Sequence, residues 1–335
     1  MSHAATAVEG PGDLVTADSE APAEPAQDAA PLSSTAALEG WDQLTRQLAL
    51  LLRQEEPDAA WLEQIGSAAV QMRALAQRGV DAALYLLVQA AAADLDRYSA
   101  RHAMLCALIC DVCAEGLGWP AGEVDTLVRA ALTMNLSMSD MQDALARQAE
   151  PLSEAQRAHI ESHAERSAAM LEGTGVADPV WTEIVRRHRD DAPATTAAPS
   201  PPQRMAQLLR RVDVYSAKLS SRAGRDQRSA AIAARDTCIG PDGVPDAIGS
   251  AILRALGLYP PGCFVQLANG DFAVVMKRGS KAHTPVAAAL RRQDGGMYVH
   301  PTRRDTARSS FAVVHGVTRG AVKVRCDHKR NLDCA

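Results

Sequence analysis

Two short groups of side chains could do chemistry, because their spacing places each group on one face of a helix. The first group is an imidazole and three thiols at intervals of three or four residues: His102, Cys106, Cys110 and Cys113. Imidazoles and thiolates bind zinc, but four ligands on one straight helix rarely converge on a tetrahedral ion. We therefore interpret this stripe as small side chains packed in an alanine-rich core.

The second group is the pair His159 and His163, which are four residues apart. This spacing suits a metal ion, but no glutamate stands beside His159 and no third ligand follows in register. We therefore expect His159 to be a solvated surface residue. For His163, and for His188 further along the chain, two interpretations stay open. Each is either a hydrogen-bonded core residue or a ligand position in a site built from several helices.

The chain between His102 and Asp213 carries an ordered series of motifs. They read Thr-Met-Asn-Leu-Ser-Met, then a histidine in the following predicted helix, then Ile-Val-Arg-Arg-His, and finally Arg-Arg-Val-Asp-Val-Tyr-Ser-Ala. Their order and spacing resemble the HD-GYP branch of the HD phosphohydrolases over residues 97–305. The resemblance implies that the positions of that family's metal site are occupied here by His102, Met134, Asn135, His163, His188 and Asp213.

The departures from the family pattern concern the ligands themselves. The family binds metal through a His-Asp pair, and this chain has Met134-Asn135 at that place. A thioether and an amide cannot replace an imidazole and a bridging carboxylate as ligands of hard or borderline ions. Ser137-Met138 replaces the family's Gly-Lys, Arg189-Asp190 replaces a His-Glu, and the Pro-rich segment 192–202 replaces the Gly-Tyr-Pro loop. The metal pair that phosphodiester hydrolysis requires is therefore not expected.

These losses predict a catalytically degenerate signalling protein that binds a protein partner or a cyclic dinucleotide and needs no cofactor. One alternative is an active metal-dependent phosphohydrolase or cyclic-di-GMP phosphodiesterase, which would need a divalent metal such as iron or manganese. Another is a helical dimerisation scaffold, and a homo-oligomer is compatible with every alternative. Arg210, Arg211 and Lys218 share one predicted helix and are the expected binding surface for an acidic partner or a nucleotide.

Composition narrows the class of partner and the compartment. The net charge is −5 and aromatic residues make up 4% of the chain, so stacking platforms for nucleic acid are not expected. No apolar run is long enough to span a membrane, and no basic segment precedes an apolar one as in a secretory signal. The seven cysteines, an odd number, favour free thiols in the cytoplasm.

Helical periodicity and abundant alanine predict a mainly α protein, with an HD-type helical core, an N-terminal helical module and a small C-terminal β-containing extension. Ser153 and Gln156 predict a capping box. Asn269-Gly270 between apolar runs predicts a β-hairpin. Residues 1–40 hold seven acidic residues and no Lys or Arg, which is typical of disorder. The expected division is a disordered acidic tail (1–40), a helical module (41–98), a degenerate HD-GYP-like core (99–235), a small α/β extension with a hairpin (236–310) and a basic tail (311–335).

Overall fold

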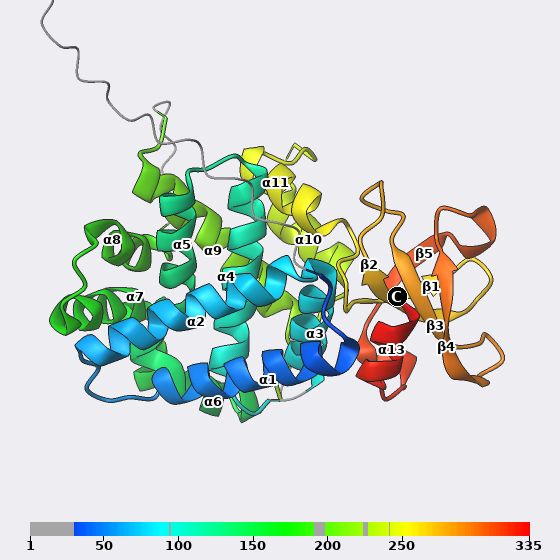
Figure 1. The fold of residues 1–335 in the computed structure, drawn as a ribbon, viewed down its shortest axis with the longest axis horizontal. Helices are drawn as coiled ribbons and strands as arrows, with labels where there is room; N and C mark the ends of the chain where they lie inside the picture. Colours follow the sequence, from blue (N-terminus) through cyan, green and yellow to red (C-terminus); the bar gives the residue numbers. More distant parts are fainter. Residues whose placement is uncertain (1–29, 94, 191–197, 224–226, 241) are drawn as a thin grey trace, which may run out of the picture.

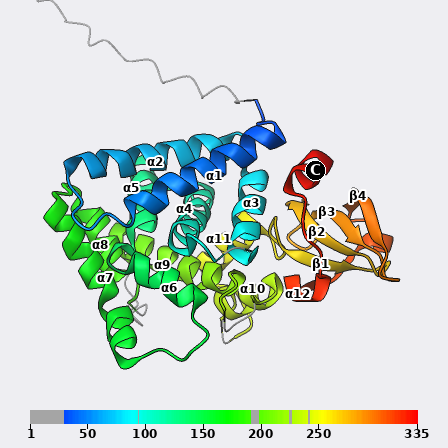
Figure 2. The same ribbon diagram turned by 90° about the horizontal axis from the view of Figure 1, so that it is seen from below.

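The computed structural model describes residues 30–335 except 94, 191–197, 224–226 and 241. The described chain is mainly helical and carries a small antiparallel sheet near its C-terminus, as the sequence predicts. Figures 1 and 2 both show the helices gathered into one body with the sheet at one end. A continuous apolar core runs from Ala37 in the first helix through the helical body into the sheet.

The N-terminal helices are α1 (Ser34–Leu51), α2 (Ala59–Gln77) and α3 (Val80–Ala93). Ser33 and Asp58 cap α1 and α2, because each side chain accepts a backbone N–H from the first turn. The prediction of disorder over 1–40 was therefore wrong for the last residues of that segment. The Ser33 cap and the buried side chains of Ala37 and Trp41 stabilise α1 there. The rest of that acidic segment, 1–29, lies outside the described residues.

The helix α4 (Tyr98–Gly116) passes through the middle of the helical body, and nearly every one of its residues is buried. It packs against α3 and against three helices that follow it in the chain, α5, α9 and α11. The remaining helical elements are α5 (Ala121–Thr133), the one-turn η1 (Leu136–Met138), α6 (Ser139–Arg147), α7 (Glu154–Thr174), α8 (Pro179–Arg187), α9 (Pro201–Leu219), α10 (Ala230–Cys238) and α11 (Ala247–Leu256). The predicted capping box of Ser153 and Gln156 opens α7.

The sheet has the strand order β4-β3-β2-β1-β5, and every neighbouring pair is antiparallel. The strands are β1 (Phe264–Leu267), β2 (Phe272–Lys277), β3 (Val286–Arg291), β4 (Met297–Asp305) and β5 (Val313–Val317), with the one-turn η2 (Ser309–Phe311) before β5. The predicted hairpin joins β1 to β2, and Gly270 takes the positive φ of 83° that its turn requires. One face of the sheet joins the helical core through Phe264, Val274 and Ala288.

The structure corrects the expectation of a basic tail over 311–335. This segment contains β5, which pairs with β1, and two short helices, α12 (Arg319–Val322) and α13 (His328–Cys334). Both helices are anchored by buried side chains, Val322 in α12 and Asn331 in α13. Asn331 donates a hydrogen bond to the Tyr85 hydroxyl of α3 at 2.8 Å, so the C-terminal segment closes the junction between helices and sheet.

Gly262, which lies just before β1, packs closely against α3. A substitution at this position therefore tests the junction between the sheet and the helices. The φ of Gly262 is +94°, and an added Cβ would lie 2.7 Å from the Val88 side chain and 2.9 Å from the Tyr85 carbonyl oxygen. Gly262→Ala should therefore lower the free energy of unfolding by about 2–4 kcal/mol, the sum of left-handed strain and overpacking.

Gly295→Ala is the matched control, since Gly295 has a φ of +91° but no atom within 4 Å of an added Cβ. It should cost only the strain, about 1 kcal/mol. Urea denaturation of both variants measures the difference. Equal losses would mean that the sheet is not seated on α3 as described.

Candidate functional site

The structure brings five of the predicted site residues together from five elements. His102 lies on α4, Asn135 follows α5, His163 lies on α7, His188 ends α8, and Asp213 lies on α9. A pocket of about 310 Å³ is lined by His102, Asn135, His163 and Asp213, and His188 is buried directly behind His163. Met134 is fully buried in the apolar core and does not line this pocket.

A hydrogen bond between two residues of the pocket lining joins α4 to α9. His102 Nε2 donates to Asp213 Oδ1 at 2.7 Å, and the two side chains are only 1% and 15% exposed. Burial works against charge on His102, but the nearby Cys106 and the hydrogen bond to Asp213 outweigh it and raise the pKa of His102 well above its ordinary value. Burial likewise opposes charge on Asp213, yet the His102 bond holds the pKa of Asp213 at about 2. The pair is therefore ionised near neutral pH.

His163 and His188 meet edge to face, with their Nε2 atoms 3.1 Å apart. Each ring donates its Nδ1–H to a carbonyl of its own helix, His163 to Ile160 and His188 to Val185, both at 2.6 Å. Burial lowers the pKa of His163, and it lowers that of His188 to about 4. Both rings are therefore neutral at pH 7, and two Nε2 lone pairs face each other. A proton or a cation between them would relieve that repulsion.

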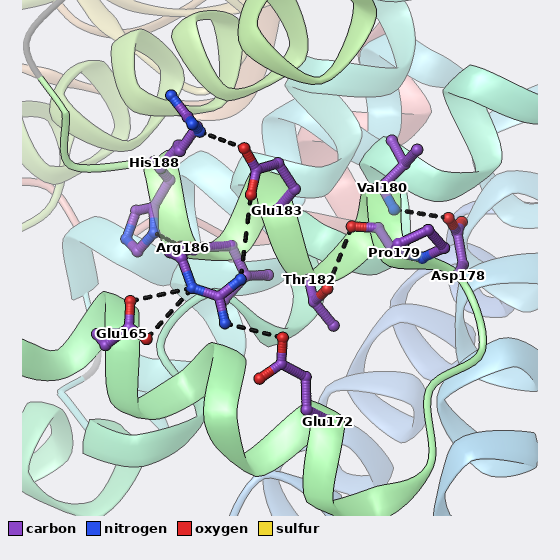
Figure 3. A network of polar contacts seen from close by, with 11 residues as sticks. Glu165, Glu172, Asp178, Pro179, Val180, Thr182, Glu183, Arg186 and His188 are labelled. Carbon is purple, nitrogen blue, oxygen red and sulfur yellow. Dashed lines mark hydrogen bonds and ion pairs between the residues drawn. The ribbon is translucent and has the colours of Figure 1, made fainter.

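Ion pairs join α7 to α8 near the contact of His188 with His163. Figure 3 shows Arg186 of α8 reaching Glu165 and Glu172 of α7. The distances are 3.0 Å to Glu165 and 2.8 Å to Glu172. Because Arg186 bridges the two helices beside the histidine pair, it fixes the end of α8 where His188 stands.

The HD phosphohydrolase resemblance implies a pair of metal ions, and the donor set does not fit one. Asn135 offers a neutral amide where a bridging carboxylate would be needed. His102 Nε2, the atom that would bind a metal, donates to Asp213 instead. The second oxygen of Asp213 faces the guanidinium of Arg189 at 4.0 Å, so its charge is already compensated from both sides. A single ion is the most that one carboxylate could support here.

Cys106 is buried in the core, as predicted, but its contact with His102 was not foreseen. Cys106 Sγ lies 3.6 Å from His102 Nε2, and the potential ligand atoms of His102, Cys106 and Asp213 lie within 4.8 Å of one another. The i, i+4 spacing of His102 and Cys106 was the available signal. His159 was wrongly expected on the solvated surface, since it is half-buried and its Nε2 donates to the Ser137 carbonyl at 2.9 Å. Cys110 and Cys113 are buried in the core, as predicted.

The walls of the pocket are strongly basic. Among the residues that the structure describes, its lining contains one carboxylate, Asp213, and four cations: Arg189, Lys218, Arg222 and Arg228. Arg222 stacks over the Tyr98 ring at 5.1 Å and donates to its hydroxyl, which fixes the guanidinium at the pocket edge. Arg189 and Arg228 keep about half of their side-chain surface exposed to solvent. The arrangement favours a ligand that carries negative charge.

The predicted binding surface of Arg210, Arg211 and Lys218 is largely engaged within the protein. Arg211 makes a two-pronged ion pair with Asp246, both bonds being 2.8 Å long. Lys218 pairs with Asp236 at 3.0 Å, and Arg210 donates to the backbone carbonyls of Arg189 and Asp190. Of these three residues, Lys218 alone lines the pocket. The segment 192–197, the greater part of the predicted Pro-rich loop, lies outside the described residues.

Comparisons with protein-family models, curated proteins and solved structures found no match to this chain. Among the described residues, no helix has both the length and the hydrophobicity that crossing a membrane requires.

The buried His188 predicts a specific dependence of stability on pH. Its pKa is about 4 in the folded protein and about 6.5 when unfolded, so between these values the unfolded chain binds the extra proton. Acidification from pH 6.5 to 4 should therefore destabilise the wild type relative to His188→Gln by about 2–3 kcal/mol. Urea denaturation at a series of pH values measures this difference.

His315→Gln, which changes an exposed histidine on β5, is the control and should leave the pH profile of the wild type unchanged. Parallel profiles for the wild type and His188→Gln would show that His188 is not held neutral in the folded protein.

Proposed function

We propose that this chain is a catalytically degenerate HD-GYP-like signalling protein that binds a phosphate-bearing ligand without hydrolysing it. The observation that supports this proposal best is the pocket at His102 and Asp213, whose described lining combines four cations with one carboxylate that is hydrogen-bonded to His102. Guanidinium groups bind phosphate oxygens through paired N–H donors, so Arg189, Arg222 and Arg228 are suited to this ligand.

The size of the pocket bears on the ligand. A cavity of about 310 Å³ is at the lower end of small-molecule sites, which hold one compact group. A cyclic dinucleotide, the ligand that the family resemblance implies, would place one phosphate among the arginines and leave the rest of the molecule partly exposed. In this proposal the protein acts in the cytoplasm. A signalling partner distinguishes the protein with bound ligand from the protein without it.

The chemistry of the pocket argues against hydrolysis. Cleavage of a phosphodiester by HD phosphohydrolases needs two clamped cations and a metal-bound hydroxide. Here Asn135 supplies no bridging oxygen charge, and Asp213 is held between His102 and Arg189. Fixed arginines take the place of metal charge, which stabilises a bound phosphate but generates no nucleophile.

The first prediction of this proposal concerns turnover. Full-length protein purified anaerobically with added iron or manganese should not hydrolyse cyclic di-GMP above the rate in buffer, because the metal pair cannot assemble. Product formation measured by chromatography tests this. Metal-dependent hydrolysis that disappears in both His163→Ala and Asp213→Ala would contradict the proposal and favour a surviving phosphodiesterase.

The second prediction concerns binding. Arg189→Ala and Arg228→Ala should each raise the Kd for cyclic di-GMP about 10-fold, the loss of one charge-assisted contact. The isosteric Asn135→Asp should also weaken binding, because it adds a negative charge to the pocket lining. Isothermal titration calorimetry of the full chain measures all three constants.

Arg46→Ala provides the control, since Arg46 is exposed on α1 and pairs with Asp42 away from the pocket lining. It should bind as the wild type does. Wild-type affinity in all three pocket variants, or no binding by the wild type, would remove this pocket as the ligand site.

A further inference from the structure

A second basic pocket lies between the end of α3, the connection from α9 to α10 and the C-terminal segment 318–325. It has a volume of about 590 Å³, and three of its lining residues are cationic: Arg319, Lys323 and Arg325. Among the described residues no carboxylate lines it, and its remaining polar groups are Ser221, Gln227 and Thr318. None of the three cations forms an ion pair within the described part of the chain, although most basic side chains of the helical body do.

Buried neighbours hold the backbone that carries these cations. Arg319 Nη1 lies 3.4 Å from the Oε1 of Gln89, a fully buried side chain whose amide donates to the Gly262 carbonyl. Lys323 and Arg325 are exposed and alternate with Val322 and Val324, which are buried. The buried residues therefore anchor the segment, and the charged ones stay at the pocket.

Lys323 ends α12 in a strained backbone conformation, in which its N–H donates to the Arg319 carbonyl. Its φ is +52° and its ψ is 40°, a left-handed conformation that costs a residue with a side chain about 1–2 kcal/mol relative to glycine. Glycine or asparagine would be the usual residue at such a helix end. The side chain of Lys323 is exposed at this pocket, so its charge is available to a ligand.

We propose that this second pocket binds a small ligand carrying two or more linked phosphoryl groups. Three separated cations match a charge spread over several phosphate oxygens, and the two arginines provide paired donors. The described lining has no aromatic ring on which a base could stack, so recognition rests on the phosphates.

The site is distinct from the His102–Asp213 pocket, and the two share a wall. Ser221 and Gln227 line the second pocket, and their chain neighbours Arg222 and Arg228 line the first. Because the lining residues do not overlap, each pocket can be disabled without touching the other.

Inorganic pyrophosphate is the probe, and isothermal titration calorimetry of the full chain is the measurement. To silence the first pocket, the titration is done in the Arg189→Ala/Arg228→Ala background as well as in the wild type. Pyrophosphate should bind in both, and orthophosphate should bind at least about 10-fold more weakly because it engages fewer cations.

Lys323→Gly is the decisive variant, because it removes the charge and relieves the left-handed strain. It should keep or raise the stability of the fold and raise the Kd for pyrophosphate about 10-fold. Lys329→Ala is its control, since Lys329 is an exposed cation of α13 that pairs with Asp333 and lies outside the lining.

Four outcomes would overturn the proposal, the first three of which concern the second pocket directly. Those three are no pyrophosphate binding by the wild type at millimolar concentration, equal affinity for orthophosphate, and unchanged binding in Lys323→Gly. Loss of binding in the Arg189→Ala/Arg228→Ala background would also overturn it, because the ligand would then belong to the first pocket.

Discussion

The structure depends on how the carboxylate of Asp213 is accommodated between α4 and α9. A buried carboxylate is costly unless charge and hydrogen bonds compensate it, and His102 supplies both. Arg189 faces the second oxygen, and the neutral rings of His163 and His188 complete the surroundings. This compensation ties α4 to α9 and therefore contributes to the stability of the helical body. Removing either partner of the pair would leave an uncompensated group in the centre of the helical body.

The same compensation defines what the pocket can bind. Lys218 and Arg228 face Asp236, which lies outside the lining, and Arg222 forms no ion pair within the described part of the chain. The described lining therefore carries more positive than negative charge, and the space between these cations favours an anion. The chain repeats this arrangement beside the sheet, where Arg319, Lys323 and Arg325 surround a second space without a carboxylate in its described lining. The overall charge of −5 does not reveal these two basic pockets, because many acidic residues lie in other parts of the sequence, such as residues 1–40. A statement about partners that is based on net charge alone therefore misses both pockets.

The sequence predicted the elements well where the pattern was local. Helical periodicity, the Ser153 capping box and the Asn269-Gly270 turn all correspond to observed elements. The resemblance to the HD-GYP family also anticipated that distant positions such as His102 and Asp213 would meet. The helices α12 and α13 were not predicted because they are short and are held by buried contacts of Val322 and Asn331 with distant parts of the chain. Of the cations that line the first pocket, the predicted binding surface contained Lys218 alone, since only the folded chain shows that Arg211 is paired with Asp246 and that Arg228 lines the site.

A crystal structure of the protein grown with cyclic di-GMP and manganese would test the central claim most directly. Our account predicts an intact phosphodiester with a phosphate against Arg189, Arg222 and Arg228, while His102 stays hydrogen-bonded to Asp213. Two manganese ions ligated by His102, His163, His188 and Asp213 beside a cleaved dinucleotide would contradict it. In that case the helical body would be a working hydrolase, and Asn135 would be a tolerated substitution at a functional metal centre.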